Sequence, residues 1–151
     1  MRMRRRGLAL VSLVAVAIML AGCAGNRIST VISIQSKATD DLVGIKNVVK
    51  DNQAGLQTVN CGTRDGKPVD CYVAIMADLG QVAIYNDALA TALKASNTTD
   101  AKKAIADMTG VVETWLNTGL LKVPANAKLP LQIGLEAMRP VLLVMSSNLG
   151  V

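Results

Sequence analysis

The chain has 151 residues, with sixteen Lys and Arg, eleven Asp and Glu, and no histidine. The absence of histidine excludes Ser-His-Asp and Cys-His catalytic arrangements, and also zinc sites built on histidine ligands. Four of the sixteen basic residues precede residue 23, which leaves twelve basic against eleven acidic side chains, a net charge of +1, in the rest of the chain. The excess of +5 over the whole chain therefore does not indicate a surface that binds nucleic acid.

The first 22 residues have the pattern of an export signal. Residues 2–6 carry four arginines, and residues 7–19 are apolar except for Ser12. A basic segment, a short apolar segment and small residues before a cleavage site are typical of secretory signal peptides. The apolar run is too short to cross a bilayer comfortably, because a transmembrane helix needs about 20 apolar residues.

The segment Leu20-Ala21-Gly22-Cys23 follows this run directly. It resembles the lipobox of bacterial lipoproteins, and the resemblance covers residues 1–24 only. It implies a lipoprotein signal peptide over residues 1–22, removed by cleavage, and acylation of Cys23, which contacts the membrane through its acyl chains. Two other interpretations stay open: an uncleaved N-terminal membrane anchor, and an ordinary signal peptide followed by a chance cysteine.

The residue after the cysteine bears on location. In Gram-negative lipoproteins an aspartate there favours retention at the inner membrane, whereas this chain has Ala24. The resemblance thus implies the periplasmic face of the outer membrane. Residues 23–26 form an acylated tether that reaches only about 10–14 Å, so we expect the domain of residues 27–151 to lie close to the lipid surface.

Apolar residues in the rest of the chain recur at steps of three and four, which predicts helices and no competing strand pattern. The expected helices span residues 27–58, 69–95, 98–117 and 129–148. The fold class predicted is all-α, a four-helix up-down-up-down bundle in one domain. Thr98 or Thr99 is expected to cap the third helix, which should stop at Gly119 through a positive φ. Pro140 should kink the fourth helix or split it.

Cys61 and Cys71 flank the first connection between helices. An even pair of cysteines in an exported protein predicts a disulfide, which would stabilise the fold by roughly 2–3 kcal/mol. Free thiols and a metal site are the alternatives, and the metal site lacks further ligands. Asp65-Gly66 predicts a turn inside the loop, and Pro68 is expected near the start of the second helix.

The search for catalytic chemistry is mostly negative, so no enzyme activity, cofactor or metal is expected. Glu113 and Glu136 are the only glutamates, and nothing in their spacing pairs them across a cleft as a glycosidase requires. Three aspartates also lie on expected helices: Asp78, Asp87 and Asp107. All five carboxylates are explained by positions on solvent-exposed faces of helices. The sequence also lacks a phosphate-binding glycine loop and a calcium-binding loop.

Three features raise the question of a binding surface. The cysteine loop carries Arg64, Asp65 and Lys67, which indicates either a stapled turn or a rigid recognition loop. Residues 141–145 are apolar nearly all round, which indicates either a buried helix or a contact between copies of the chain. The lysines of the middle helices fit solvated side chains better than a lipid headgroup site: Lys94, Lys102 and Lys103.

These observations favour a lipid-anchored envelope protein that acts by contact at the membrane. An accessory subunit of an envelope complex, or a blocker of an unknown envelope protein partner, would both fit. A carrier of a small apolar ligand between the helices is the first alternative. A carboxylate-dependent enzyme acting on cell wall or lipid is the second.

Overall fold

The computed structural model describes residues 27–150, and these are mostly helical. The leader, the lipobox and Cys23 lie outside the described residues. The elements in chain order are α2 (Arg27–Asp51), α3 (Gln53–Leu56), β1 (Asn60–Arg64), β2 (Lys67–Asp70), α4 (Cys71–Lys94), α5 (Thr98–Asn117), the 3-10 turn η1 (Gly119–Leu121) and α6 (Ala125–Leu149).

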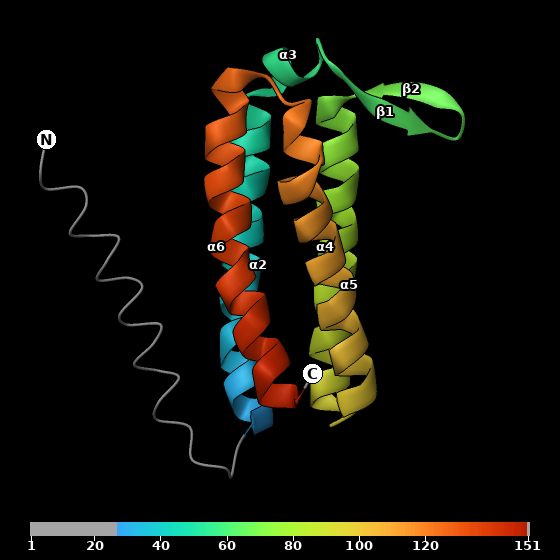
Figure 1. The fold of residues 1–151 in the computed structure, drawn as a ribbon. Helices are drawn as coiled ribbons and strands as arrows, with labels where there is room; N and C mark the ends of the chain where they lie inside the picture. The colour runs from blue at the N-terminus through green and yellow to red at the C-terminus, as the bar shows by residue number, and fades with distance from the viewer. Residues whose placement is uncertain (1–26, 151) are drawn as a thin grey trace, which may run out of the picture.

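The four long helices α2, α4, α5 and α6 lie side by side and form what we call the helical body (Figure 1). Within it α2 packs along α6 and α4 packs along α5, while α2 also contacts α4 and α5 contacts α6. α3 and the two strands lie at one end of the helical body. The turn between α4 and α5 lies at the other end, together with the first residues of α2 and the last residues of α6.

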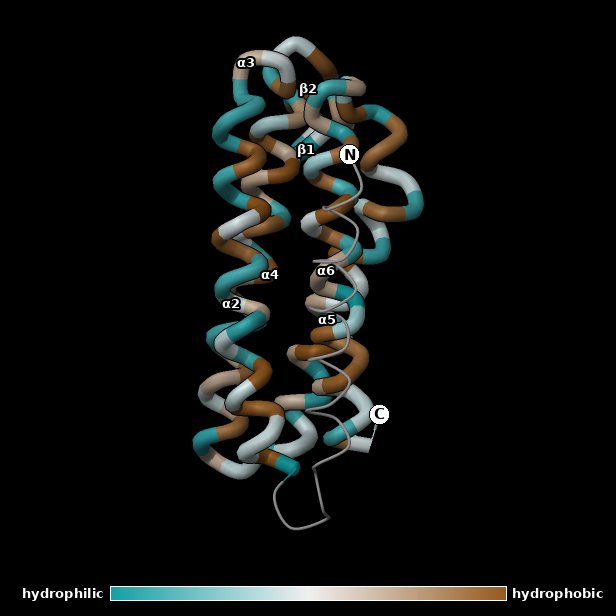
Figure 2. Tube along the Cα trace, turned by 90° about the vertical axis from the view of Figure 1, so that its left-hand side faces the viewer, coloured by the Kyte–Doolittle hydropathy of each residue, from teal (hydrophilic) through white to brown (hydrophobic). Residues whose placement is uncertain are grey.

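The core of the helical body is made by the expected apolar stripes. In α2 the buried residues are Val31, Ala38, Leu42, Ile45 and Val49. Steps of seven, four, three and four residues keep these side chains on one face, because a helix turns once every 3.6 residues. Figure 2 shows the consequence as brown apolar segments that alternate with teal polar ones along the helices.

One polar residue is buried between α2 and α4. Asn86 is only 4% exposed, and its Nδ2 donates a hydrogen bond of 2.9 Å to Oγ1 of Thr39. Gln35 also donates to the backbone carbonyl of Asn86 through its Nε2, at 3.5 Å. A shift of α2 along α4 would leave Asn86 buried and unpaired, which costs free energy. The pair therefore helps to fix the register of the two helices.

Two of the expected helix limits are wrong, one at the end of the first helix and one at the start of the third. The first helix does not run to residue 58, because α2 ends at Asp51 and a separate short helix, α3, follows. The side chain of Asn52 donates to the carbonyl of Val48 at 2.9 Å, so it takes up a terminal carbonyl of α2 and favours an end there. The expected cap at Thr98 or Thr99 is also wrong: Asn97 caps α5, accepting from the backbone N–H of Asp100 at 3.1 Å.

The fourth helix is longer than expected and is not split. α6 begins at Ala125 and continues through Pro130 and Pro140. Pro140 is exposed, so the carbonyl that loses its intrahelical donor can turn to water. Gly150 ends the helix as its C-cap at φ 73°. Among the described residues, α6 is the one helix long and apolar enough to cross a membrane by length and composition alone.

The expected stop at Gly119 through a positive φ is wrong, because α5 ends at Asn117 with Thr118 as its C-cap. The glycines with positive φ in the described range are Gly62, Gly66 and Gly150. At Gly119 a Cβ would lie 2.2 Å from Cε3 of Trp115. The missing side chain therefore makes room for the indole ring.

We expect Gly119→Ala to lower the free energy of unfolding by about 1–3 kcal/mol, because the methyl group would overlap a rigid ring in a packed site. Gly110→Ala is the matched control, since a Cβ there meets nothing within 4 Å. It should raise stability by about 0.5–1 kcal/mol through helix propensity. Urea unfolding followed by circular dichroism measures both, and equal effects would contradict the assigned role of Gly119.

Candidate functional site

The loop between the first two long helices is a β-hairpin. Asp65 and Gly66 both have positive φ, 51° and 74°, and the flanking residues Arg64 and Lys67 pair across the turn. Positive φ at both central residues is the mark of a type I′ turn, whose twist suits a two-residue hairpin. The turn prediction is confirmed, but the expectation of no strand is wrong, because β1 and β2 pair antiparallel on either side of it.

Pro68 also lies elsewhere than expected. It pairs with Thr63 within the hairpin instead of starting a helix. The helix starts at Cys71, and Asp70 is its cap: the Asp70 carboxylate accepts from the backbone N–H of Val73 at 2.8 Å. The strand is hard to predict because only three residues separate the turn from the cap, too few for an alternating pattern.

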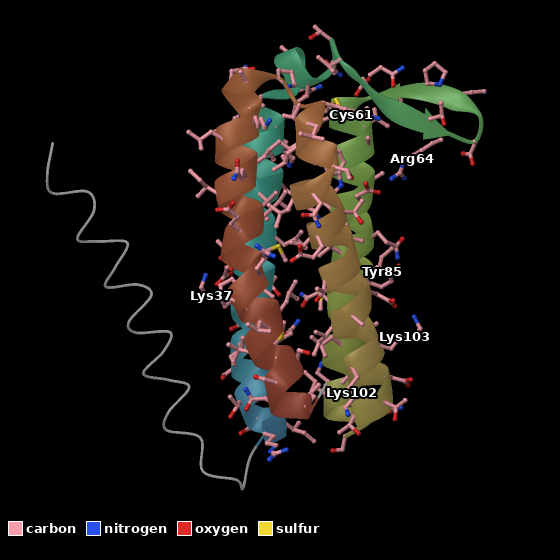
Figure 3. The ribbon with its side chains drawn as sticks, in the orientation of Figure 1. Lys37, Cys61, Arg64, Tyr85, Lys102 and Lys103 are labelled. Atoms are coloured by element: carbon pink, nitrogen blue, oxygen red, sulfur yellow. A yellow bond between two sulfur atoms is a disulfide. The ribbon has the colours of Figure 1, made fainter. Side chains whose placement is uncertain are left out.

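The predicted disulfide between Cys61 and Cys71 is present, with the two Cα atoms 4.7 Å apart. Cys71 is the first residue of α4 and is fully buried. Cys61 lies in β1, where the strand register shifts between Asn60 and Gly62. The bond thus joins the hairpin to the start of α4 rather than joining two helix ends. Figure 3 shows Cys61 where the hairpin meets the helices.

A polar contact provides a second link between the hairpin and the helical body. Arg64 of β1 forms an ion pair with Oδ1 of Asp78 on α4, and Oδ2 of Asp78 accepts a hydrogen bond of 2.9 Å from Nε1 of Trp115 on α5. Arg64 and Asp78 are partly exposed, so solvent screens their ion pair. The Trp115 bond is charge-assisted and partly buried, which makes it the stronger member.

This contact corrects the expectation that Asp78 is simply a solvated helix residue. Its carboxylate holds three elements together: β1, α4 and α5. The partners lie 14 and 37 residues away along the chain. The sequence offers no local signal for such a cluster, although a lone tryptophan with an N–H that needs an acceptor is a hint.

A cleft of about 300 Å³ lies between the hairpin and the nearby ends of α4 and α5. The hairpin contributes residues 61–64 and Val69. The helices, η1 and the residues on either side of η1 contribute Ala74, Asp78, Thr114, Trp115, Thr118, Gly119 and Lys122. Two cations, three threonines and an indole thus surround one hollow. The hairpin is the element that closes it.

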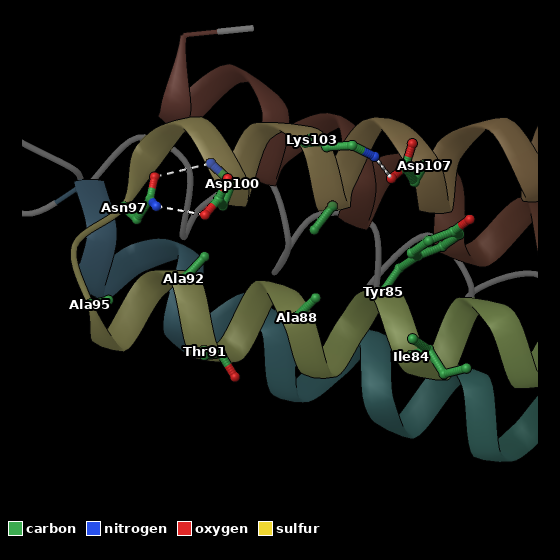
Figure 4. Close-up of a pocket in the computed structure, with 11 residues that line it drawn as sticks. Ile84, Tyr85, Ala88, Thr91, Ala92, Ala95, Asn97, Asp100, Lys103 and Asp107 are labelled. Atoms are coloured by element: carbon green, nitrogen blue, oxygen red, sulfur yellow. Dashed lines mark hydrogen bonds and ion pairs between the residues drawn. The ribbon is translucent and has the colours of Figure 1, made fainter.

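A second, larger hollow of about 570 Å³ is a surface groove between α4 and α5 (Figure 4). Small side chains form much of it, namely Ala88, Ala92, Ala95 and Ala104. Lys103 and Asp107 form an ion pair at its edge, at 2.5 Å. The hydrogen bond to the Asp107 carboxylate, with its negative charge, raises the pKa of Lys103.

The two glutamates are not brought together. Glu113 on α5 forms an ion pair with Arg139 on α6 at 2.6 Å, whereas Glu136 accepts from Gln132 within α6. Neither glutamate lines either hollow. Over residues 27–150 no group of three or more candidate ligands could hold a metal ion.

Two further candidate surfaces were residues 141–145 and the lysines of the middle helices. In the segment of residues 141–145, Leu142, Val144 and Met145 are buried while Leu143 is 69% exposed. The segment is therefore mainly a core segment, with one outward leucine. Lys102 donates to the carbonyl of Gly150 at 3.1 Å, which ties the start of α5 to the end of α6.

Comparison of the chain with models of known protein families, with curated proteins and with solved structures gives no significant match. The candidate site is thus defined by its geometry: a hairpin stapled to α4 and a cleft beside it.

We expect the double substitution Cys61→Ala/Cys71→Ala to lower the free energy of unfolding by about 2–3 kcal/mol and to leave the helical signal unchanged, because the stripes define the helices. Relative to the native protein, the double variant should show faster amide hydrogen exchange in the hairpin and little change in the middle of α4. Unchanged exchange in the hairpin would contradict the view that the disulfide fixes its position.

Proposed function

We propose that this protein is a lipid-anchored envelope protein that acts by protein contact at the membrane, with the hairpin as its contact element. In this proposal residues 1–22 are a cleaved lipoprotein signal peptide and Cys23 carries the acyl chains. The domain is a four-helix up-down-up-down bundle on the periplasmic face of the outer membrane. It acts as an accessory subunit or a blocker of an envelope partner.

The bundle topology is supported by the order of contacts. Each long helix packs against the next long helix along the chain, and α6 closes the set by packing along α2. Short connections favour this arrangement, because helices joined by a few residues must run side by side in opposite directions. Only Ala95, Ser96 and Asn97 connect α4 to α5.

The observation that carries the proposal is a hairpin that is exposed and yet firmly held. Residues 63–68 are all exposed, so they add little to the core. The disulfide, the Asp70 cap and the Arg64–Asp78–Trp115 contact nevertheless fix the hairpin to the helical body. A rigid loop loses little conformational entropy on binding, which suits recognition.

The anchor would set the distance at which contact occurs. Residue 27, next to the tether, lies at the end of the helical body opposite the hairpin (Figure 1). A helix of 25 residues such as α2 is about 37 Å long. With a tether of about 10–14 Å, the hairpin of an upright domain would meet its partner roughly 50 Å from the lipid surface.

The groove between α4 and α5 favours a second candidate, carriage of a small apolar ligand. Its alanine-rich lining offers room for an acyl chain or a similar molecule. Native mass spectrometry of the purified domain distinguishes the two candidates. Loss of a bound lipid on Ala88→Leu, which places a larger side chain at an exposed position of the groove, would favour the carrier.

Acylation at Cys23 is tested by mass. The membrane fraction should contain residues 23–151 plus the mass of acyl groups, because the lipobox resemblance implies cleavage before the cysteine. Cys23→Ser should give an unmodified and poorly processed precursor. Normal processing and membrane attachment of this variant would refute the lipoprotein assignment.

The contact proposal is tested by lengthening the tether. About twenty Gly and Ser residues inserted after Gly25 would form a flexible linker with an end-to-end distance of roughly 22–27 Å. The domain could then move that much further from its anchor. This lowers its effective concentration at a partner surface held at a fixed distance from the membrane. We therefore expect unchanged thermal unfolding but loss of much of the phenotype of the native gene in a complementation assay.

The enzyme alternative makes the opposite prediction in the same assay. A periplasmic enzyme with a diffusing substrate should tolerate the long tether but lose activity on Glu113→Gln/Glu136→Gln. This result would overturn the contact proposal. Both glutamates lie outside the hairpin cleft, so the contact proposal expects the double variant to function.

A further inference from the structure

The two edges of the hairpin differ in what they can bind. The type I′ turn makes Arg64 and Lys67 the hydrogen-bonded pair nearest the turn, because hydrogen-bonded and non-hydrogen-bonded pairs alternate in an antiparallel ladder. Thr63 and Pro68 are therefore a non-hydrogen-bonded pair. Their backbone polar groups point outward, away from the other strand.

On the β2 edge this outward position is occupied by a proline. Pro68 has no N–H, and proline on an edge strand blocks pairing with another chain. On the β1 edge the matching position is Thr63, which keeps both N–H and C=O. Within the hairpin, β1 is thus the edge that can accept a further strand.

The cleft beside the hairpin is lined mainly by β1 on the hairpin side. Four of the five hairpin residues that line it belong to β1, from Cys61 to Arg64. Its other wall includes Thr114, Trp115 and Thr118 of α5 and its C-cap. A strand of three residues spans about 10 Å, so a short extended segment is the kind of ligand that suits a cleft of about 300 Å³.

We propose that the cleft binds an extended segment of the partner protein, which adds to β1 as a third strand through main-chain hydrogen bonds to Thr63. This inference rests on the proposed contact function and names its binding mode. Strand addition of this kind gains affinity from the backbone and specificity from pockets for alternate side chains.

Charge in the cleft selects the partner segment. Arg64 and Lys122 both line it, and the one carboxylate among its lining residues, Asp78, is already engaged by Arg64 and by Trp115. An acidic side chain on the incoming strand would pair with Lys122 or share Arg64. The partner segment is therefore extended and carries at least one Asp or Glu.

The probe is a pair of acetylated, amidated heptapeptides of alternating Val and Thr, one with Glu and one with Lys at the centre. The acylated, disulfide-bonded chain in detergent micelles is titrated with each. Amide hydrogen exchange at Thr63 should slow at least tenfold with the Glu peptide, and Trp115 emission should change. The Lys peptide should bind at least threefold more weakly.

Three variants test whether the partner segment binds at the β1 edge. Thr63→Pro removes the outward N–H and should abolish protection and binding, whereas Thr63→Val keeps the N–H and should retain both. Pro68→Thr opens the other edge and should leave binding at β1 intact. Unchanged exchange in α4 of the unliganded Thr63→Pro variant verifies that the body is folded.

Three results would overturn the proposal: full binding by Thr63→Pro, saturation without slower exchange at Thr63, or no binding of the Glu peptide at millimolar concentration. The complementation assay separates this failure from failure of the contact function. If Thr63→Pro complements and the long tether does not, contact stands and strand addition falls. If the long tether complements fully, the contact function itself fails.

Discussion

The position of the hairpin depends on Cys71. This residue is the first of α4, is fully buried, and forms one half of the disulfide to Cys61. Because Cys71 is packed into the core, the covalent bond transfers the rigidity of the helical body to β1. A disulfide between two exposed loop residues would restrain the chain without orienting the hairpin on the body.

Asp78 gives the hairpin its orientation. The disulfide alone would leave rotation about one attachment point, whereas the contact of Arg64 with Asp78 fixes a second point on β1 further toward the turn. The ion pair itself is worth little in a solvated position, about 0–1 kcal/mol. The hydrogen bond from Trp115 to the same carboxylate is worth roughly 1.5–3 kcal/mol. Trp115 therefore determines where the carboxylate stands, and Gly119 makes room for its ring.

The same arrangement explains why the hairpin and the helical body differ in composition. The helices need long apolar stripes and tolerate many polar residues on their outer faces. The hairpin has no core of its own, since a two-stranded sheet is marginally stable in water. It is held by covalent and polar links instead. Its outer residues, Thr63 to Pro68, are consequently free of packing demands, which is the condition under which a surface can serve recognition.

The sequence by itself determined the periodic and the short-range features. Steps of three and four predict the four long helices, Asp65-Gly66 predicts the turn, and the two cysteines predict their bond. Each of these signals depends on residues within one element or on the chemistry of one residue type. The lipobox resemblance belongs to the same class, as a short linear motif, and it lies outside the described residues.

Only the tertiary structure decided where the strands lie and which carboxylate matters. β1 and β2 are too short for an alternating pattern, and they form because the turn geometry and the disulfide bring them together. Asn97 rather than Thr98 or Thr99 caps α5, since several neighbouring polar residues could serve and packing selects one. Asp78 meets Arg64 and Trp115 across 14 and 37 residues of chain. No local pattern predicts these contacts, because they form only when α5 and the hairpin both pack against α4.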